Sequence, residues 1–284
     1  MTKPENSKLI VLDIDNTINT KNLNGEIQLV KEFIDLHTKI DLKKNIKIAY
    51  NTTRGISRVL EMLKGEQEYF GNGVISALNG SLIYDLKGMQ QLEGYTISND
   101  IRKMLSEWFI KNTDITFMAF YTNNDIYGHV YLKDANNVDE FYKLHESSFN
   151  HEKYRCISDP KIFASWIEQK DINMIEFKTA DENKTNEFLI NNPNINFSFD
   201  GHFYINPKGI NKGSGLRDLI RFIYRDETNL DIIVAGDSKT DLAMFLDSNY
   251  MNIIVGERLP EIRNENYTKV KDPKELCSIL SSLL

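Results

Sequence analysis

The sequence has few of the features that would place it outside the ordinary globular proteins. Its two cysteines, Cys156 and Cys277, lie far apart and match no zinc-ligand spacing, so we expect both to be reduced packing residues. No apolar run approaches the ~20 residues that a membrane span requires. The polar start, MTKPENSK, lacks the apolar core of a signal peptide. These absences predict a cytoplasmic protein with no membrane partner.

A long basic run is also missing. The 284 residues carry a formal net charge of −7, so we expect no nucleic-acid partner held by phosphate contacts. The hydrophobic share of 41% is ordinary for a packed protein. This length fits one large domain or two modest ones, as a monomer or a homodimer.

The stretch KLIVLDIDNT, from Lys8 to Thr17, is the clearest local signal. Its apolar half predicts a buried parallel strand at Lys8–Leu12, and open α/β sheets place ligands at the carboxyl ends of such strands. Asp13 and Asp15 follow, and in an extended chain their side chains would point the same way. Two carboxylates this close need a cation or a shared proton, which suits a nucleophile and a general acid. A helix-capping aspartate is the alternative.

Predicted strands and helices alternate through the N-terminal part. We expect a polar flap at 18–26, then a helix at Ile27–Ile40, a strand at Asn45–Tyr50, a helix at Ser57–Lys64, a strand at Val74–Leu78 and a hairpin return at Ser81–Asp85. The β-α-β-α order predicts a parallel sheet with helices on its faces. The three predicted parallel strands all end in small or polar residues, which indicates a shared polar crevice.

The order of the predicted elements changes at about residue 86, where strands come in pairs with helices between them. The predicted elements are helices at Asn99–Lys111, Val138–Phe149, Lys161–Ile167 and Asp181–Ile190, and strands at Ile115–Tyr121, Ile126–Leu132, Asn173–Lys178 and Asn194–Asp200. This α+β pattern predicts an antiparallel sheet covered on one side, inserted as a domain at 86–203.

Single strands and helices alternate again after the insert, so the core domain is expected at 1–85 and 204–284. Its second half has predicted helices at Ser214–Arg225, at Lys239–Leu246 and from Pro273, and strands at Asp231–Ala235 and Met251–Val255.

Four segments at predicted strand ends or helix starts carry the candidate chemistry. In order they read DIDNT, TTR, INKG and GDSKTD. Their order and content resemble the haloacid dehalogenase (HAD) superfamily of phosphohydrolases. The insert resembles that of class IIB, the Cof-like and sucrose-phosphate-phosphatase-like group. The resemblance implies a Rossmann-like parallel-sheet core with an inserted α+β cap, and a Mg²⁺-dependent phosphatase acting on a small metabolite such as a sugar phosphate.

The resemblance also implies roles for the acidic residues. Asp13 matches the nucleophile that forms an aspartyl-phosphate, and Asp15 matches the acid/base that protonates the leaving oxygen and later activates water. Asp13, the backbone carbonyl of Asp15, and Asp237 match the metal ligands, with Asp241 a further, partly outer, carboxylate. Mg²⁺ prefers such oxygen ligands, and a phosphoryl group needs its charge neutralised.

The other matched residues would bind the substrate. Thr52 matches the hydroxyl that hydrogen-bonds the phosphoryl group, and a helix N-cap is its alternative reading. Lys212 matches the lysine that pairs with the nucleophile; on its own, a lysine beside a glycine would be read as a solvated side chain. Thr53 and Arg54 complete the expected substrate-binding set.

Three positions depart from the family pattern. Asn16 replaces the glycine of DxDGT, Thr53 that of TGR, and Thr240 the asparagine of GDxxND. Asparagine tolerates positive φ, whereas a β-branched threonine does not. A phosphomutase of the phosphomannomutase type is an alternative function, and so is a catalytically idle ligand-binding protein, although the matched aspartates and Lys212 are all retained.

Overall fold

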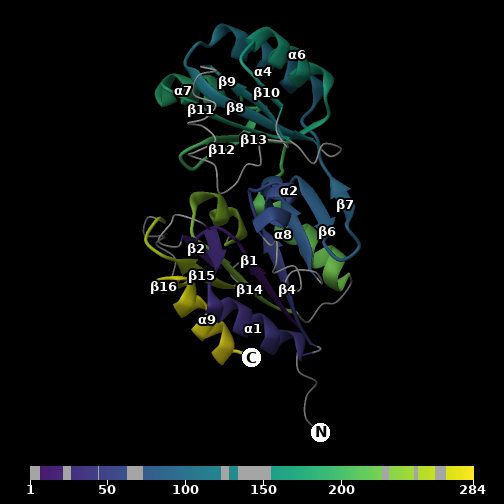
Figure 1. Cartoon of the computed structure of the whole chain (residues 1–284), viewed down its shortest axis with the longest axis vertical. Coiled ribbons are helices and arrows are strands. Elements are labelled where there is room, and N and C mark those ends of the chain that lie inside the picture. Colours follow the sequence, from purple (N-terminus) through teal and green to yellow (C-terminus); the bar gives the residue numbers. More distant parts are fainter. Residues whose placement is uncertain are drawn as a thin grey trace. The chain divides into compact units, whose positions relative to one another are not determined.

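The three-dimensional structure is a computed structural model. It describes residues 7–21, 27–43, 45–62, 73–122, 128–133, 155–225, 230–245, 249–259 and 267–284. Contacts divide the chain into two compact units (Figure 1). The first comprises Met1–Thr53, Met62–Leu92 and Asn211–Leu284, and the second comprises Arg54–Glu61 and Glu93–Ile210. Among the described residues, no helix combines the length and apolar character needed to cross a membrane.

In its described part, the first unit is built on a sheet of eight strands in the order β16-β15-β14-β1-β4-β5-β6-β7. The strands are β1 (Ser7–Leu12), β4 (Ile46–Asn51), β5 (Val74–Ala77), β6 (Leu82–Asp85), β7 (Gln90–Gly94), β14 (Leu230–Gly236), β15 (Met251–Val255) and β16 (Tyr267–Val270). The run from β16 to β5 is parallel, whereas β6 returns antiparallel to β5. The predicted Rossmann-like α/β class is confirmed.

Helices α1 (Lys31–Asp41), α8 (Lys212–Tyr224) and α9 (Pro273–Ser282) cover this sheet. Leu9 and Val11 of β1 pack with Leu216 and Leu219 of α8 in one apolar cluster. Successive side chains on a strand alternate between faces, and the intervening Ile10 is also fully buried. Helices α1 and α9 lie side by side and contact β4 and β15, respectively (Figure 1). The continuous apolar sequence of β1 fits a strand buried on both faces.

The segment after β1 corrects the prediction of a polar flap followed by a helix from Ile27. The described residues form a hairpin of β2 (Asn19–Lys21) and β3 (Ile27–Leu29), and α1 begins only at Lys31. The N–H of Val30 donates to the carbonyl of Ile18 at 3.1 Å, and both side chains are buried. The apolar residues that resembled a first helical turn therefore anchor the hairpin instead.

The second unit has a sheet with the order β10-β9-β8-β11-β13-β12. Its described elements are β8 (Ile115–Thr122), β9 (His129–Leu132), β10 (Arg155–Ile157), β11 (Ile172–Thr179), β12 (Asn196–Phe199) and β13 (Phe203–Asn206), with helices α2 (Ile56–Met62), α4 (Asn99–Lys111), α6 (Pro160–Gln169) and α7 (Glu182–Asn191). Helix α2 contributes its first six residues to this unit. In the described part of this sheet the neighbouring strands are antiparallel, except that β9 and β10 are parallel. The helix predicted at Val138–Phe149 lies outside the described residues.

Several short elements differ from the sequence-based expectation. Strands β7, β13 and β16 were not predicted, because their sequences QQLEG, FYIN and YTKV are short and show little alternation. β7 joins the first sheet and β13 the second, so the contact-based division falls after Leu92 and Ile210 rather than after residues 85 and 203. The helix predicted at Lys239–Leu246 is the 3₁₀ helix η4 (Lys239–Met244), and another, η1 (Leu78–Gly80), follows β5.

Candidate active site

Strand pairing on both sides fixes the carboxyl end of β1. Leu12 lies opposite Ala235 of β14 and Tyr50 of β4. The N–H of Asp13 continues the ladder by donating to the carbonyl of Ala235 at 2.9 Å. Asp13 is only 4% exposed, so its carboxylate lies inside the protein at the sheet edge where α/β folds bind ligands.

The chain turns sharply after Asp13, which corrects the extended conformation expected there. Asp15 lies in this turn, which is closed by a backbone hydrogen bond of 3.1 Å from the N–H of Ile18 to the carbonyl of Ile14. Asn16 has a φ of 56°, a value that asparagine adopts more readily than most residues. The Oδ1 of Asn19 accepts from the N–H of Asn16 at 2.9 Å, and its Nδ2 donates to Oδ1 of Asp15 at 3.4 Å. Asn19 therefore ties the Asp15 carboxylate to the turn.

Helix α8 begins at Lys212 because Asn211 caps it. Oδ1 of Asn211 accepts from the N–H of Ser214 at 3.0 Å, and Oγ of Ser214 accepts from the N–H of Asn211 at 2.9 Å. A Cβ at Gly80 would lie 2.2 Å from the carbonyl oxygen of Asn211, so a glycine is needed for this close approach. Nδ2 of Asn51 donates to the carbonyl of Lys212 at 2.7 Å. These contacts fix the start of α8 against β4 and η1.

The ammonium group of Lys212 bridges two buried carboxylates. Its Nζ lies 2.6 Å from Oδ1 of Asp13 and 2.5 Å from Oδ1 of Asp241. One carboxylate oxygen each from Asp13, Asp237 and Asp241 lies within 4.8 Å of the others, and all three residues are buried. We call these three residues the aspartate cluster.

Asp241 organises the turn that follows β14. Its Oδ2 accepts from the N–H of Asp237 at 3.1 Å, and from the N–H and the hydroxyl of Ser238, both at 2.9 Å. A Cβ at Gly236 would lie 2.4 Å from Cγ of Asp241, so this carboxylate occupies the space that a side chain would take. Because both oxygens of Asp241 already accept hydrogen bonds, its carboxylate is less available as a metal ligand than that of Asp13 or Asp237.

Charge at the cluster is not balanced by the protein alone. Burial raises the pKa of Asp13 above its ordinary value, while Lys212 acts against that rise. Burial and the charge of Asp241 raise the pKa of Asp237 to about 6, although Arg258 lowers it. Burial lowers the pKa of Lys212, but its two carboxylate partners outweigh burial and raise that pKa above the ordinary value. Lys212 is therefore an ammonium ion at neutral pH.

A divalent cation fits this donor set. Carboxylate oxygens are the ligands that Mg²⁺ prefers. Oδ2 of Asp13 has one long contact of 3.5 Å, from the hydroxyl of Thr17, and Oδ1 of Asp237 takes part in none of the hydrogen bonds that hold the described site together. Asp13 and Asp237 therefore each have an oxygen available to a cation, and the cation would supply the positive charge that the buried cluster lacks.

Comparison with known proteins decides the family. A family model described as haloacid dehalogenase-like hydrolase matches residues 10–267. The chain belongs to this family. The match includes the whole aspartate cluster and Lys212, so the four sequence segments that suggested the HAD resemblance lie within one continuous family match.

A related protein and several solved structures match this HAD chain over most of its length. A protein of Mycoplasma capricolum described as uncharacterized is 25% identical over 250 residues, covering 84% of this chain and 87% of the relative. A solved structure described as a HAD subclass IIB sugar phosphatase has a TM-score of 0.76 at 15% identity, covering 97% of this chain and 98% of that one. A HAD phosphatase from Bacteroides thetaiotaomicron has a TM-score of 0.71 at 19% identity, covering 99% and 97%. The chain thus has the fold of these HAD subclass IIB structures.

The remaining residues assigned by the HAD resemblance follow β4. Thr52 is fully buried, its N–H donates to the carbonyl of Ser76 at 2.8 Å, and its carbonyl accepts from the N–H of Asn79 at 3.0 Å. Thr53 belongs to the first unit and Arg54 to the second. Thr53 is not among the described residues with positive φ, so the backbone strain that its β-branched side chain suggested is absent.

The third departure from the HAD pattern is accommodated locally. The hydroxyl oxygen of Thr240 lies 2.8 Å from that of Ser238, which in turn donates to Asp241. Sequence reasoning missed Asn51, which holds Lys212, and Arg258, which donates to Asp237 at 3.0 Å. Both are polar residues at or just after the carboxyl end of a parallel strand, and that position is the signal that could have found them.

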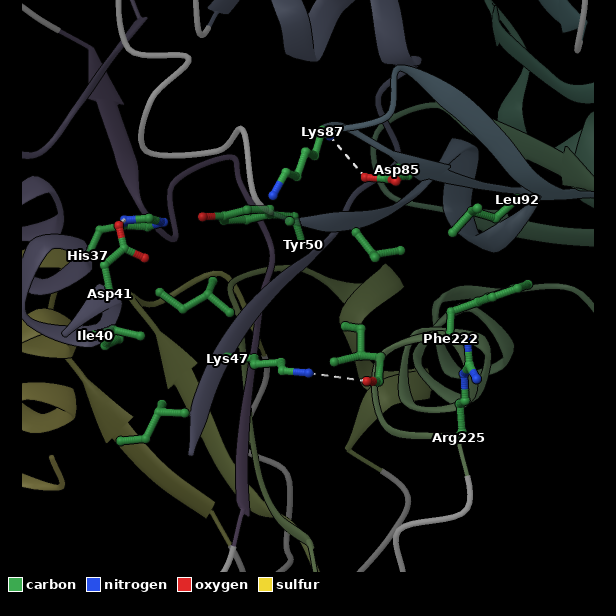
Figure 2. A pocket seen from close by; sticks show the side chains of 15 residues that line it. His37, Ile40, Asp41, Lys47, Tyr50, Asp85, Lys87, Leu92, Phe222 and Arg225 are labelled. Carbon is green, nitrogen blue, oxygen red and sulfur yellow. Dashed lines mark hydrogen bonds and ion pairs between the residues drawn. The ribbon is translucent and has the colours of Figure 1, made fainter. Parts of the chain in front are cut away.

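A separate cavity of about 510 Å³ lies elsewhere in the first unit (Figure 2). It is lined by the first residues of β4 and β5 and by the C-terminal turns of α1 and α8. Figure 2 shows Tyr50 and His37 at one end and Phe222 and Arg225 at the other. No member of the aspartate cluster lines it, so this cavity is not part of the candidate active site.

Proposed function

We propose that this protein is a Mg²⁺-dependent phosphohydrolase that removes phosphate from a small metabolite through an aspartyl-phosphate at Asp13. The observation that carries the proposal is the buried contact of 2.6 Å between Lys212 and Asp13 at the edge of the aspartate cluster. A nucleophilic carboxylate must be ionised, and a phosphoryl group approaching it needs positive charge nearby. Lys212 supports both requirements at a single site.

Each residue then has a chemical role. Oδ of Asp13 attacks phosphorus, and the bond from phosphorus to the leaving oxygen breaks as Asp15 donates a proton to that oxygen. Asp15, now ionised, takes a proton from the water that attacks the aspartyl-phosphate, which releases inorganic phosphate and restores Asp13. Mg²⁺ held by Asp13, Asp237 and the backbone carbonyl of Asp15, with Asp241 behind them, would neutralise phosphoryl charge.

Three further residues bind the transferred group in this proposal. Thr52 would donate its hydroxyl to the phosphoryl group, Lys212 would neutralise part of that group's charge, and Thr53 and Arg54 are the remaining candidates for binding the substrate. The substrate is a small phosphorylated metabolite, most simply a sugar phosphate. The support is the shared fold with a subclass IIB sugar phosphatase, together with the net charge of −7, which disfavours large polyanionic partners.

The test is phosphate release from a panel of phosphorylated sugars and other metabolites, with and without Mg²⁺. Asp13→Asn keeps the size of the side chain but removes the nucleophile, and should abolish release while the protein stays folded by circular dichroism. Release by Asp13→Asn at the wild-type rate would refute the covalent route. No release by the wild type across the panel would direct the same assay to a phosphomutase reaction with a bisphosphate activator.

A further inference from the structure

Two side chains from distant parts of the sequence hold the same oxygen of Asp237. Nη1 of Arg258 donates to Oδ2 of Asp237 at 3.0 Å, and Nδ2 of Asn16 donates to it at 3.1 Å. Asp237 is 3% exposed, whereas the side chain of Arg258 is 52% exposed. A buried carboxylate oxygen thus accepts from one cationic donor near the surface and one neutral donor in the turn after β1.

The loop that carries Arg258 contacts β16 on one side of this residue and is buried at Leu259 on the other. The N–H of Gly256 donates to the last residue of β16 at 2.8 Å, and Leu259 is buried. Between them, Glu257 forms an ion pair of 2.7 Å with Lys269 of β16. The guanidinium is therefore presented to Asp237 by an anchored loop.

Asn16 is held in place by the turn that follows β1. Its positive φ places it in the turn, and its N–H donates to Asn19. The turn leaves the amide side chain directed at Asp237, where it can orient the carboxylate but adds no charge.

We infer that Arg258 and Asn16 are positioning residues that set, in opposite directions, how tightly the aspartate cluster binds its divalent cation. The inference rests on the metal-dependent function proposed above. Asn16 strengthens binding by holding Asp237 in one orientation. Arg258 weakens binding, because its guanidinium charge repels a cation that shares the same carboxylate.

Arg258 both orients Asp237, which favours metal binding, and repels a cation, which opposes it. The larger of these two effects decides whether loss of Arg258 strengthens or weakens metal binding. Without Arg258, Asp237 would still be buried and held by Asn16, so little orientation would be lost. The guanidinium of Arg258 is half-exposed, so water screens its repulsion of a dication bound by the same carboxylate, and this repulsion changes the affinity by roughly tenfold. Charge repulsion therefore outweighs orientation at Arg258, and the reverse holds at Asn16.

The experiment is titration of the metal-free, full-length protein with Mn²⁺ alone, followed by the paramagnetic resonance signal of free Mn²⁺. Arg258→Met should bind Mn²⁺ roughly tenfold more tightly than wild type, and Arg258→Lys should bind close to wild type because it keeps the charge. Asn16→Gly, which suits the positive φ, should bind several-fold more weakly. The gain in Arg258→Met should shrink at high salt, which screens exposed charges, whereas the loss in Asn16→Gly should not.

Arg221→Met is the matched control. Arg221 is 54% exposed and paired with Asp218 at 3.1 Å, much as Arg258 is paired with Asp237. It lies nine residues into α8 from Lys212, or about 13 Å along the helix, so its loss should leave Mn²⁺ affinity unchanged. Equal or weaker binding by Arg258→Met would overturn the inference. If Asp237→Ala binds Mn²⁺ as well as wild type, the proposed metal-dependent function itself is wrong.

Discussion

The Nζ atom of Lys212 lies 2.6 Å from Oδ1 of Asp13, although 199 positions separate the two residues in the sequence. Asp13 follows β1 and Lys212 begins α8, and β1 and α8 share one apolar cluster. Both side chains are almost fully buried. A charged pair without access to water is costly unless each partner is satisfied, and Lys212 is satisfied by the two carboxylates it bridges.

Lys212→Met should remove the positive charge that the cluster needs. Methionine is unbranched and apolar like the stem of the lysine side chain, but it leaves Asp13 and Asp241 without the cation that bridges them. We expect the metal-free protein to lose about 3–5 kcal/mol of unfolding free energy, measured by urea denaturation. Turnover should be lost as well. A variant as stable as the wild type in a chelator would show that Lys212 does not hold the cluster together.

The stability of the metal-free protein should fall as pH rises through the range in which Asp237 titrates. Burial raises the pKa of Asp237 from its ordinary value of 3.8 to about 6, so the folded state binds more protons than the unfolded state between these values. The unfolding free energy then decreases with pH across that window, by on the order of 3 kcal/mol from this residue. Urea denaturation at a series of pH values with a chelator present measures this slope.

Asp237→Asn is the control for that slope: because the amide does not titrate, the curve should become shallower by the contribution of Asp237, while the contribution of the buried Asp13 remains. Mg²⁺ should stabilise the wild type more at pH 7.5 than at pH 5, since a cation binds the ionised carboxylate. A wild-type slope of the opposite sign between pH 4 and 6 would contradict this assignment of the buried carboxylate.

The aspartates could be predicted from the sequence because buried parallel strands are apolar runs, and the residue at which such a run stops is easy to locate. β1 and β14 read as continuous apolar runs that stop at Asp13 and Gly236, and the sheet brings such ends to one edge. An inserted domain was likewise predicted from the change from alternating single strands to paired ones. These features depend on local hydrophobic pattern, which the sequence states directly.

Other parts of the site depend on contacts that no local pattern contains. Arg258 reaches Asp237 because β15 lies beside β14, and its loop is tied to β16, a strand with too few apolar residues to predict. The hairpin after β1 was missed for a related reason. Leu29 and Val30 fit the apolar spacing of a helix equally well, and only their packing decides between the two.

Gly236→Ala should disturb the cluster without adding or removing a charge. The new Cβ would lie 2.4 Å from Cγ of Asp241, so the carboxylate must move away from its donors. We expect a loss of about 1–3 kcal/mol in stability, which is typical of overpacking, together with weaker Mg²⁺ binding by calorimetry. Gly209→Ala meets open space, although the φ of 76° strains an alanine there, so it should cost stability and leave Mg²⁺ binding intact. Equal metal affinity in both variants would contradict a role for Asp241 in shaping the site.

In the proposed reaction, Asp13 carries the phosphoryl group during turnover. The direct measurement is acid quenching of the wild-type protein within one turnover of its best substrate, followed by peptide mass spectrometry. We expect one phosphoryl group on the peptide containing Asp13, and none on that peptide in Asp13→Asn. Phosphate release with no phosphorylated peptide at the shortest quench times, or with the phosphoryl group on another residue, would contradict it.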